Sequence, residues 1–420
     1  MSRAAKETRA TGRRWKLVAA LIGFLVVHGL LVSSSLRKVW LAVDYYESMV
    51  QAGAVLYRSG QLDPLYGRKL TFEGNSSLPQ WMLEYFDWHT VERATLTPEN
   101  WEYHRYLVMR CWMRDGKCGG ASDRLQSLPW ALSLAQQSNR LLFIHWERPA
   151  PLQEYLVPRN EGIDWTVPAW LADFWLEKRP SVQTSGGNKT LVVALRNDTL
   201  VTLRQQANDH GADAYNSWRK TEGEPTFDEV MGPLWHTLFQ PAPTIAGEID
   251  ERLHQLGLQS GNYVAVHHRS KYIKDRSDEM DAVHNSIHCA TQLNDSQPIY
   301  FASDSRNVSR EAVEYGKRSG LQVSALLDSE DPLHLDRGHE FFQNSNASMS
   351  HASWKYNDVF VDLYLLAGGS CTVYGIGGFG YWASLLSKDR TCRMKHHKTP
   401  CELEARNTTA GQDDEQQRGV

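Results

Sequence analysis

Blocks of apolar residues alternate with amphipathic stretches from residue 105 onward. The segments 105–112 and 141–146 are short and mostly apolar, as expected of buried strands. Between them, a glycine-containing turn at 117–120 precedes apolar residues at helical spacing over 122–137. We therefore predict a strand, helix, strand unit, which is the building block of a parallel sheet covered by helices.

A second and longer series of the same kind begins near residue 262. We predict strands at 263–267, 299–302, 321–326 and 371–374, and helices at 282–293, 310–319, 358–367 and 381–387. The two series together predict an α/β protein with two Rossmann-like domains facing a cleft. In such folds, ligands bind in the crevice outside the carboxyl ends of the strands.

One apolar stretch near the N-terminus is longer than any of these segments. Residues 17–36 contain no charged residue, and a helix of about 20 residues spans a bilayer core of roughly 30 Å. We predict a transmembrane signal anchor; a cleaved signal peptide is the alternative, but its apolar region is usually only about 7 to 15 residues. The basic cluster in residues 1–16 faces the cytosol by the positive-inside rule, which makes the topology single-pass type II.

The composition is that of a folded chain. Apolar residues make up 41% and charged residues 22% of the 420 residues, which excludes a collagen-like or wholly disordered protein. The formal net charge is −4; six basic residues and one acidic residue give residues 1–16 a charge of +5, so the rest of the chain carries −9. This balance gives no electrostatic reason to expect a nucleic-acid partner.

The sequons and the cysteines are both typical of a chain that is translocated into the secretory pathway. Sequons for N-glycosylation are more frequent than chance predicts. They lie at Asn75, Asn188, Asn197, Asn294, Asn307, Asn346 and Asn407. Six cysteines in an oxidising compartment favour disulfides, and we expect the locally close pairs Cys111 with Cys118 and Cys392 with Cys401.

The strand predicted at 263–267 ends in side chains suited to a phosphate. His267 and Arg269 are two residues apart, so they lie on the same side if the strand continues. An arginine holds a phosphate or pyrophosphate by two charge-assisted hydrogen bonds and stays charged at any working pH. The same pattern also fits a core histidine followed by a surface ion pair.

A glycine-rich loop follows the last predicted strand. Its sequence, Gly375-Ile-Gly377-Gly378-Phe-Gly380, matches G-x-G-x-x-G, in which backbone N–H groups approach a phosphate at the start of a helix. A nicotinamide site would also need a further βαβ unit and an acidic residue about 20 positions on. The chain enters a polar tail instead, so a sugar nucleotide is favoured over a nicotinamide cofactor.

Two other predicted turns face the same cleft. Ser303 and Asp304 follow the strand at 299–302, where a carboxylate can contact a nucleoside or cap the next helix. In the first half of the chain, the corresponding turn and helix start contain Gly119, Gly120, Asp123 and Arg124.

The order of these pieces resembles the GDP-fucose-dependent fucosyltransferase superfamily, which contains α1,6-, xyloglucan-type and protein O-fucosyltransferases. The resemblance covers roughly 105–395. It rests on the Gly119-Gly120-x-x-Asp123-Arg124-Leu125 turn, the His267-x-Arg269 and Ala302-Ser303-Asp304 strand ends, and Asp362-Leu-Tyr followed by the glycine loop. It implies a GT-B-like fold and metal-independent, inverting transfer of fucose from GDP-fucose, with no cofactor, to a glycan or protein hydroxyl.

The resemblance also implies a role for each candidate residue. Arg269 would hold the β-phosphate and support the leaving diphosphate, His267 would brace it, and Ser303 and Asp304 would contact the nucleoside. The residues expected to line the phosphates are Gly377, Gly378, Phe379, Gly380 and Tyr381. The α1,6 enzymes carry a second arginine directly after the first, and Ser270 stands there in this chain, which does not support core α1,6 activity.

The transfer needs a base for the acceptor hydroxyl. Asp275, Asp278 and Glu279 follow Arg269, and Asp123 lies across the predicted cleft, so Asp275 and Asp123 join Arg269 as the catalytic candidates. We expect no metal ion at the site, because the chain has no D-x-D motif and because the i, i+4 pair His284 and His288 lacks an H-E-x-x-H arrangement.

The predicted organisation follows from these features. The segments are a cytoplasmic basic tail at 1–16, the anchor at 17–36, a stem and N-terminal subdomain at 37–100, an acceptor-side domain at 101–257, a nucleotide-sugar-binding domain at 258–401 and a disordered tail at 402–420. We expect the protein in the Golgi or ER membrane with a lumenal catalytic region. The alternatives are a transferase for another nucleotide sugar, such as GDP-mannose or a UDP-sugar, and a non-catalytic, membrane-anchored glycan-binding relative.

Overall fold

The computed structural model describes most of the chain beyond residue 77. The described residues are 78–113, 115, 118–178, 195, 198–205, 211–273, 275–327, 331–335, 353–396 and 401–403. The predicted anchor at 17–36 and the tail before it lie outside them. Among the residues described, none of the helices combines the length and apolarity needed to cross a bilayer.

Three parallel strands form the first sheet. Strand β1 (Tyr106–Cys111) lies between β2 (Leu141–Trp146) and β4 (Leu200–Arg204). Strand β1 is buried along its whole length, as expected of a central parallel strand. The predictions at 105–112 and 141–146 are confirmed, whereas β4 was not predicted.

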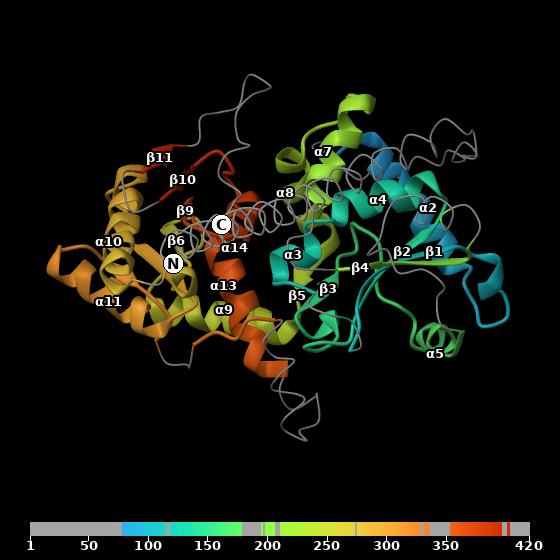
Figure 1. Ribbon diagram of the computed structural model, residues 1–420, viewed down its shortest axis with the longest axis horizontal. Coiled ribbons are helices and arrows are strands. Elements are labelled where there is room, and N and C mark those ends of the chain that lie inside the picture. The colour runs from blue at the N-terminus through green and yellow to red at the C-terminus, as the bar shows by residue number, and fades with distance from the viewer. Residues whose placement is uncertain are drawn as a thin grey trace, which may run out of the picture.

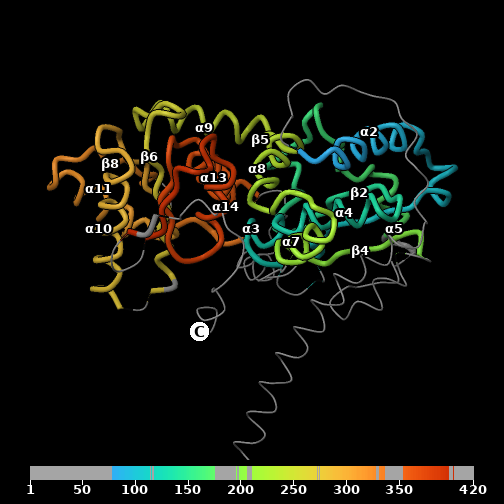
Figure 2. Tube along the Cα trace, turned by 90° about the horizontal axis from the view of Figure 1, so that it is seen from above, coloured from blue at the N-terminus to red at the C-terminus, as the bar shows by residue number. Residues whose placement is uncertain are grey.

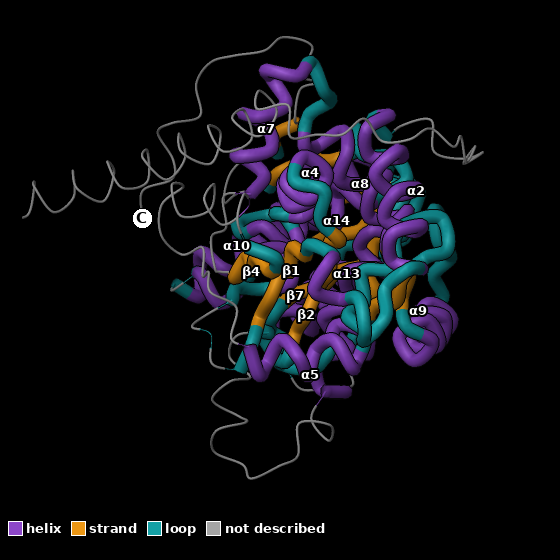
Figure 3. The backbone as a smooth tube through the Cα atoms, turned by 90° about the vertical axis from the view of Figure 1, so that its right-hand side faces the viewer, coloured by secondary structure: helices purple, strands orange, loops and turns teal. Residues whose placement is uncertain are grey.

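Helices surround this sheet (Figure 3). They are α2 (Gln80–Ala94), α3 (Ala121–Leu125), α4 (Leu128–Gln137), α5 (Ala169–Lys178), α7 (Gly211–Glu222) and α8 (Phe227–Leu238). The single helix predicted at 122–137 is wrong: α3 and α4 are separate. Pro129 stands in the first turn of α4 and has no N–H to donate back to the carbonyl of Leu125, so one continuous helix is disfavoured there.

A two-stranded antiparallel ribbon completes this part of the molecule. Strand β3 (Leu156–Pro158) pairs with β5 (Phe239–Pro241). We call the chain up to β5 the first half and the chain from α9 (Pro243–Leu256) onward the second half. The two halves lie side by side, with the second half on the left of Figure 1.

The second half contains a six-stranded sheet in the order β11-β10-β9-β6-β7-β8. Its strands are β6 (Val264–His268), β7 (Ile299–Ser303), β8 (Val323–Ser324), β9 (Cys371–Tyr374), β10 (Arg393–Lys395) and β11 (Glu402–Leu403). All pairs are parallel except β10 with β11. The strand order reverses between β6 and β9, and in open α/β sheets a crevice opens at the carboxyl ends of such a pair.

The helices of the second half cover both faces of its sheet. Helices α10 (Arg276–Leu293) and α11 (Arg306–Arg318) lie on the outer side, and α13 (Asn357–Ala367) and α14 (Gly378–Leu386) lie between the sheet and the first half (Figures 1 and 2). All four confirm predicted helices, and each begins earlier than predicted. Glu402 and Leu403 correct the predicted start of the tail, because they form β11.

One apolar core continues across the two halves. Trp235 of α8 packs edge-on against Trp382 of α14, with ring centroids 4.8 Å apart. Tyr155 stacks on Phe360 at 4.5 Å. A second apolar cluster lies under α10 and α11 on the outer side of the sheet. The cleft between the halves is therefore closed at its base by packed side chains.

Three disulfides include all six cysteines. The expected Cys111–Cys118 bond is confirmed. The expected pairing of Cys392 with Cys401 is wrong, because Cys392 bonds Cys371 and Cys401 bonds Cys289. Strand pairing explains the difference: β10 lies parallel to β9 with Arg393 opposite Thr372, which brings Cys392 beside Cys371.

Candidate functional site

A pocket lies where the carboxyl ends of β6, β7 and β9 face helix α3 of the first half. Its walls come from 120–123 in the first half and, in the second half, from the segments that follow the three strands, from 332–335 and from α13. Most of the residues predicted from sequence meet here, although they come from four separate stretches of the chain. The site is therefore shared by both halves.

Arg269 enters this pocket from the turn after β6. Its Nε lies 3.1 Å from Oδ2 of Asp304, and both side chains remain partly exposed to the pocket. The other oxygen of Asp304 accepts hydrogen bonds from the backbone N–H groups of Ser270 at 2.7 Å and Lys271 at 3.3 Å. Asp304 thus holds both the guanidinium and the turn that carries it. Its predicted contact with a nucleoside stays a prediction.

His267 lies at the inner wall of the pocket and is buried. Burial, followed by the charge of Arg269 and the neighbouring histidines, lowers the pKa of His267 to about 3, so its ring is neutral at physiological pH. Its ring packs against that of Phe379, with centroids 5.3 Å apart. A Cβ on Gly380 would lie only 2.7 Å from its Nδ1, so His267 supports the first turn of α14.

The glycine loop forms the wall next to His267. Gly377 has φ 92°, a conformation that favours glycine, and α14 begins at Gly378. Gly378 faces the first half: a Cβ there would lie 3.2 Å from Oγ of Ser122. Gly377, Gly378 and Phe379 line the pocket as predicted.

Two residues predicted to line the phosphates do not line the pocket. Gly380 packs against His267 instead. Tyr381 points to the first half, where its hydroxyl donates a hydrogen bond to Oδ2 of Asp228 at 2.6 Å. Helical geometry is the reason, because residues that follow each other in the first turn of α14 point in different directions.

The turn of the first half brings a carboxylate to the pocket. Asp123 lines it, and its Oδ2 accepts a hydrogen bond from the N–H of Gly120 at 2.8 Å. Gly119, with φ 83°, allows the sharp turn before α3. Arg124 does not face the cleft as predicted: it is buried, and its Nε donates to the carbonyl of Gly119 at 3.0 Å.

The base candidates beyond Arg269 do not line the pocket. Asp275 is exposed and caps α10, with Oδ1 accepting hydrogen bonds from the N–H groups of Ser277 at 2.8 Å and Asp278 at 3.2 Å. Glu279 accepts a hydrogen bond from the hydroxyl of Ser270. Among the sequence candidates for a base, Asp123 is the one that lines the pocket.

The structure adds residues that the sequence reasoning missed. Asp362 lines the pocket from α13, and its Oδ1 accepts a hydrogen bond from the buried hydroxyl of Tyr300. Burial raises the pKa of Asp362 to about 6. Asp362 begins the Asp-Leu-Tyr sequence on which the family resemblance partly rests, and this position could have identified it as a site residue. Lys271 and His334 also line the pocket, and the irregular segment that carries His334 gave no signal.

The remaining sequence features lie away from the pocket. Of the sequons, Asn294 and Asn307 fall within the described residues; Asn307 is exposed and Asn294 is half-buried. His284 stacks on Tyr315 with ring centroids 4.0 Å apart, and His288 contacts Gln292. In the described part of the chain, no cluster of three or more His, Cys, Asp or Glu side chains could hold a metal ion.

The fold and the site define a class: a two-part α/β protein with a pocket at the reversal of strand order, containing a guanidinium, a glycine loop and carboxylates from both halves. No protein-family model and no curated protein matches the chain.

Solved fucosyltransferases are similar in structure. A mutant of Arabidopsis thaliana FUT1 in complex with GDP has a TM-score of 0.49 and 12% identity, covering 76% of this chain and 78% of that one. The NodZ α-1,6-fucosyltransferase soaked with GDP-fucose has a TM-score of 0.39 and 16% identity, covering 70% and 94%. NodZ from Bradyrhizobium has a TM-score of 0.40 and 15% identity, covering 70% and 95%. Structural similarity at this level does not establish the activity of this chain.

Proposed function

We propose that this chain is a glycosyltransferase that transfers fucose from GDP-fucose to a glycan or protein hydroxyl, with inversion and without a metal ion. One observation carries the proposal. At the reversal of strand order, Arg269 and the glycine loop face the carboxylate of Asp123 from the other half. This arrangement suits a donor diphosphate on one side of a cleft and an acceptor hydroxyl on the other, as in a GT-B-like enzyme.

The donor diphosphate is anionic, and the chain beyond residue 16 is net negative, so the site needs local positive groups. Arg269 supplies a planar guanidinium that can form two parallel hydrogen bonds to a phosphate. Lys271 lines the same pocket and pairs with Asp331 at 3.6 Å. The N-terminus of α14, which begins at Gly378, adds backbone N–H groups and a favourable dipole.

In this proposal the nucleoside of the donor lies beside the phosphates. Ser303 and Asp362 both line the pocket and are the polar groups that we assign to the nucleoside. Because Asp304 is engaged with Arg269 and its turn, Asp362 is the carboxylate better placed to accept hydrogen bonds from N–H groups of a nucleobase. With its pKa near 6, Asp362 is ionised at neutral pH.

In the transfer step, the acceptor oxygen forms a bond to the anomeric carbon while the bond from that carbon to the β-phosphate oxygen breaks. GDP leaves with the electron pair, and the proton of the acceptor hydroxyl passes to a base. Asp123 is the base candidate that lines the pocket. Arg269 stabilises the charge that grows on the leaving diphosphate, an interaction strongest in the transition state.

The cellular setting of the proposal rests on the sequence. The charge-free stretch at 17–36, the basic residues before it and the excess of sequons favour a type II anchor with a lumenal catalytic region in the Golgi or ER. The acceptor is a glycan or a glycoprotein.

Nucleotide titration tests the donor class. The purified full-length chain is titrated with GDP, UDP and CMP by calorimetry, with and without Mg²⁺. GDP should bind most tightly, and Mg²⁺ should not change its affinity. Preference for UDP, or a strict requirement for the metal, would contradict the proposal. Release of GDP from GDP-fucose then distinguishes a transferase from a glycan-binding relative, which would release none.

The role of Arg269 has its own test. Arg269→Ala should abolish turnover while leaving the circular dichroism spectrum and thermal unfolding intact. Arg318→Ala is the matched control, because that arginine lies on the outer helix α11 with 58% of its side chain exposed. If Arg269→Ala keeps more than a tenth of the activity, about 1.4 kcal/mol of barrier, Arg269 does not have the proposed role.

A further inference from the structure

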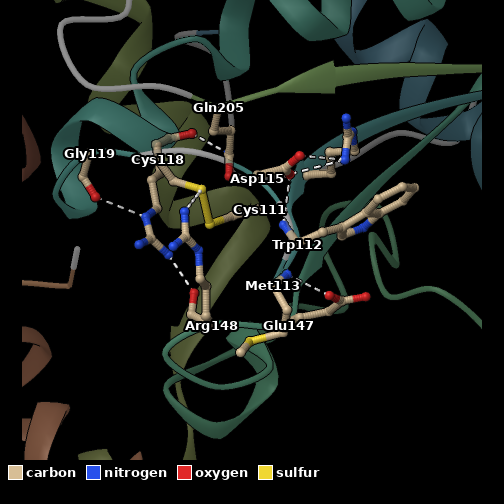
Figure 4. The surroundings of a disulfide bond; sticks show 11 residues. Cys111, Trp112, Met113, Asp115, Cys118, Gly119, Glu147, Arg148 and Gln205 are labelled. Atoms are coloured by element: carbon tan, nitrogen blue, oxygen red, sulfur yellow. Dashed lines mark hydrogen bonds and ion pairs between the residues drawn. A yellow bond between two sulfur atoms is a disulfide. The ribbon is translucent and has the colours of Figure 1, made fainter. Parts of the chain in front are cut away.

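The carboxyl ends of all three strands in the first sheet meet behind the turn that lines the pocket. Cys111 is the last residue of β1, Arg148 follows β2, and Gln205 follows β4. Figure 4 shows these three residues around Cys118 and Gly119, where the turn begins. The arrangement connects the rigid sheet to a segment that contributes Asp123 to the pocket.

Arg124 is the centre of these connections. Its Nε donates to the carbonyl of Gly119 at 3.0 Å and its Nη1 to the carbonyl of Arg148 at 2.6 Å. Its own carbonyl accepts a hydrogen bond from Nε2 of Gln205. The guanidinium also lies over the ring of Trp146, 4.7 Å from its centroid. The buried side chain of Arg124 therefore ties the turn to the end of β2, and its backbone carbonyl ties the same residue to the end of β4.

The disulfide ties the same turn to β1. It joins Cys111 to Cys118, the residue before Gly119, and Nη2 of Arg148 donates to Sγ of Cys118 at 3.1 Å. Its cysteines are only 7 residues apart, whereas Cys289 and Cys401 are 112 apart. A short closed loop removes less entropy from the unfolded chain, so this bond contributes less to global stability than the long one.

We propose that the Cys111–Cys118 disulfide and Arg124 are a positioning frame for the transfer step. The frame fixes Gly119 and the start of α3, and thereby the carboxylate of Asp123, against the strand ends. This inference rests on the proposed function. The donor-binding side chains come from the second half, so the frame acts on transfer more than on nucleotide affinity. A misplacement of about 1 Å in a catalytic group can slow a reaction about a hundredfold.

The test removes the disulfide from the full-length chain. In the double variant Cys111→Ala/Cys118→Ala, kcat should fall at least tenfold while the Kd for GDP changes less than threefold. Amide hydrogen exchange should become faster at 118–125 and stay unchanged in the strands of the second half. The matched control, Cys289→Ala/Cys401→Ala, should lower the unfolding midpoint more, yet leave kcat and exchange at 118–125 unchanged.

A second variant keeps the charge of the frame and both cysteines. Arg124→Lys loses the planar guanidinium that donates to two carbonyls at once. We therefore expect the same result: kcat falls at least tenfold, and the Kd for GDP changes less than threefold. Unchanged kcat in both variants, or kcat and GDP affinity falling together, would overturn the proposal. If the wild type neither binds GDP nor transfers fucose, the proposed function fails separately. In that case hydrogen exchange alone tests the positioning frame. Unchanged amide exchange at 118–125 in the variants would then overturn this proposal.

Discussion

Two adjacent histidines end β6, and burial affects both. His267 lines the pocket, whereas His268 points to the other face of the sheet, where its ring lies 5.5 Å from that of His396 and 6.2 Å from that of Phe301. Neither ring nitrogen of His268 has a hydrogen-bond partner among the described residues, and burial lowers its pKa to about 4. The ring is therefore neutral in the folded protein, and one N–H is buried without an acceptor.

Replacement of this residue should stabilise the protein in a pH-dependent way. The unfolded chain protonates His268 below a pH of about 6.5, and the folded chain does so only near 4, so this residue destabilises the fold increasingly as pH falls between these values. His268→Phe should raise the free energy of unfolding, by about 2 kcal/mol more at pH 5 than at pH 7. Urea unfolding at both pH values measures this difference.

The exposed His288 provides the control for that experiment. His288→Phe lies on the surface of α10 and should shift stability little at either pH. An equal gain at pH 5 and pH 7 for His268→Phe would show that removal of the unsatisfied N–H, and not protonation of the unfolded chain, explains the effect.

At the level of single residues, sequence reasoning located strand ends but not the directions of side chains. Arg269 and Gly377 line the pocket because their positions after a buried strand determine where they lie. Asp275 and Arg124 were misplaced for a different reason. In the sequence, a carboxylate that caps a helix and an arginine that donates to buried carbonyls look the same as residues of a binding site. Only their hydrogen-bond partners in the structure distinguish the two roles.

Helix α14 shows how an element positions the site. It starts at the glycine loop, and its first turn lies directly on the ring of His267. Gly380 is within the helix, where alanine would normally be favoured by about 1 kcal/mol. The close approach to His267 reverses that preference, so this glycine is needed for packing and not for its backbone conformation.

A pair of glycine substitutions tests this packing. Gly380→Ala places a Cβ 2.7 Å from Nδ1 of His267, which should lower the free energy of unfolding by about 1–3 kcal/mol and weaken GDP binding. Gly247→Ala is the control: Gly247 is exposed on α9, a Cβ there would have no atom within 4 Å, and the change should raise stability by about 0.5–1 kcal/mol. Urea unfolding and GDP titration give both readouts. A stabilised Gly380→Ala variant would contradict the close contact.

Strands were predicted better than helices. Two strands, Leu141–Trp146 and Cys371–Tyr374, have the predicted bounds, because a buried parallel strand is a continuous apolar run. Helix α10 begins at Arg276, six residues before the predicted start, because its first turn is polar and is specified by the Asp275 cap. Strand β4 was missed although its sequence, Leu-Val-Thr-Leu-Arg, contains the apolar and β-branched residues of a strand.

At the scale of the whole molecule, α8 and α14 join the two halves. Besides the tryptophan contact, Asp228 at the start of α8 accepts a hydrogen bond from Tyr381 and pairs with Arg393 at 3.1 Å. This polar cluster lies beside the apolar interface. Sequence reasoning had no access to it, since Asp228 is more than 150 residues from the other two members and no local pattern links them.

Tyr381→Phe distinguishes an interface role from a donor-binding role. Loss of the hydrogen bond to Asp228 should lower the free energy of unfolding by about 1 kcal/mol, and the Kd for GDP should change less than twofold, since Tyr381 does not line the pocket. Calorimetric titration and urea unfolding measure the two quantities. A clear loss of GDP affinity without loss of stability would restore Tyr381 to the donor site.

The approach of Gly232 to α14 has a consequence for protein engineering. A Cβ at Gly232 would overlap the carbonyl oxygen of Leu385, so the backbones of α8 and α14 touch with no room for a side chain. A chimaera that took its acceptor-side half from one relative and its donor-side half from another would have to inherit these two helices from the same parent. The crossover point best suited to domain shuffling is therefore not the chain connection between the halves, but a pair of junctions that keeps both helices together.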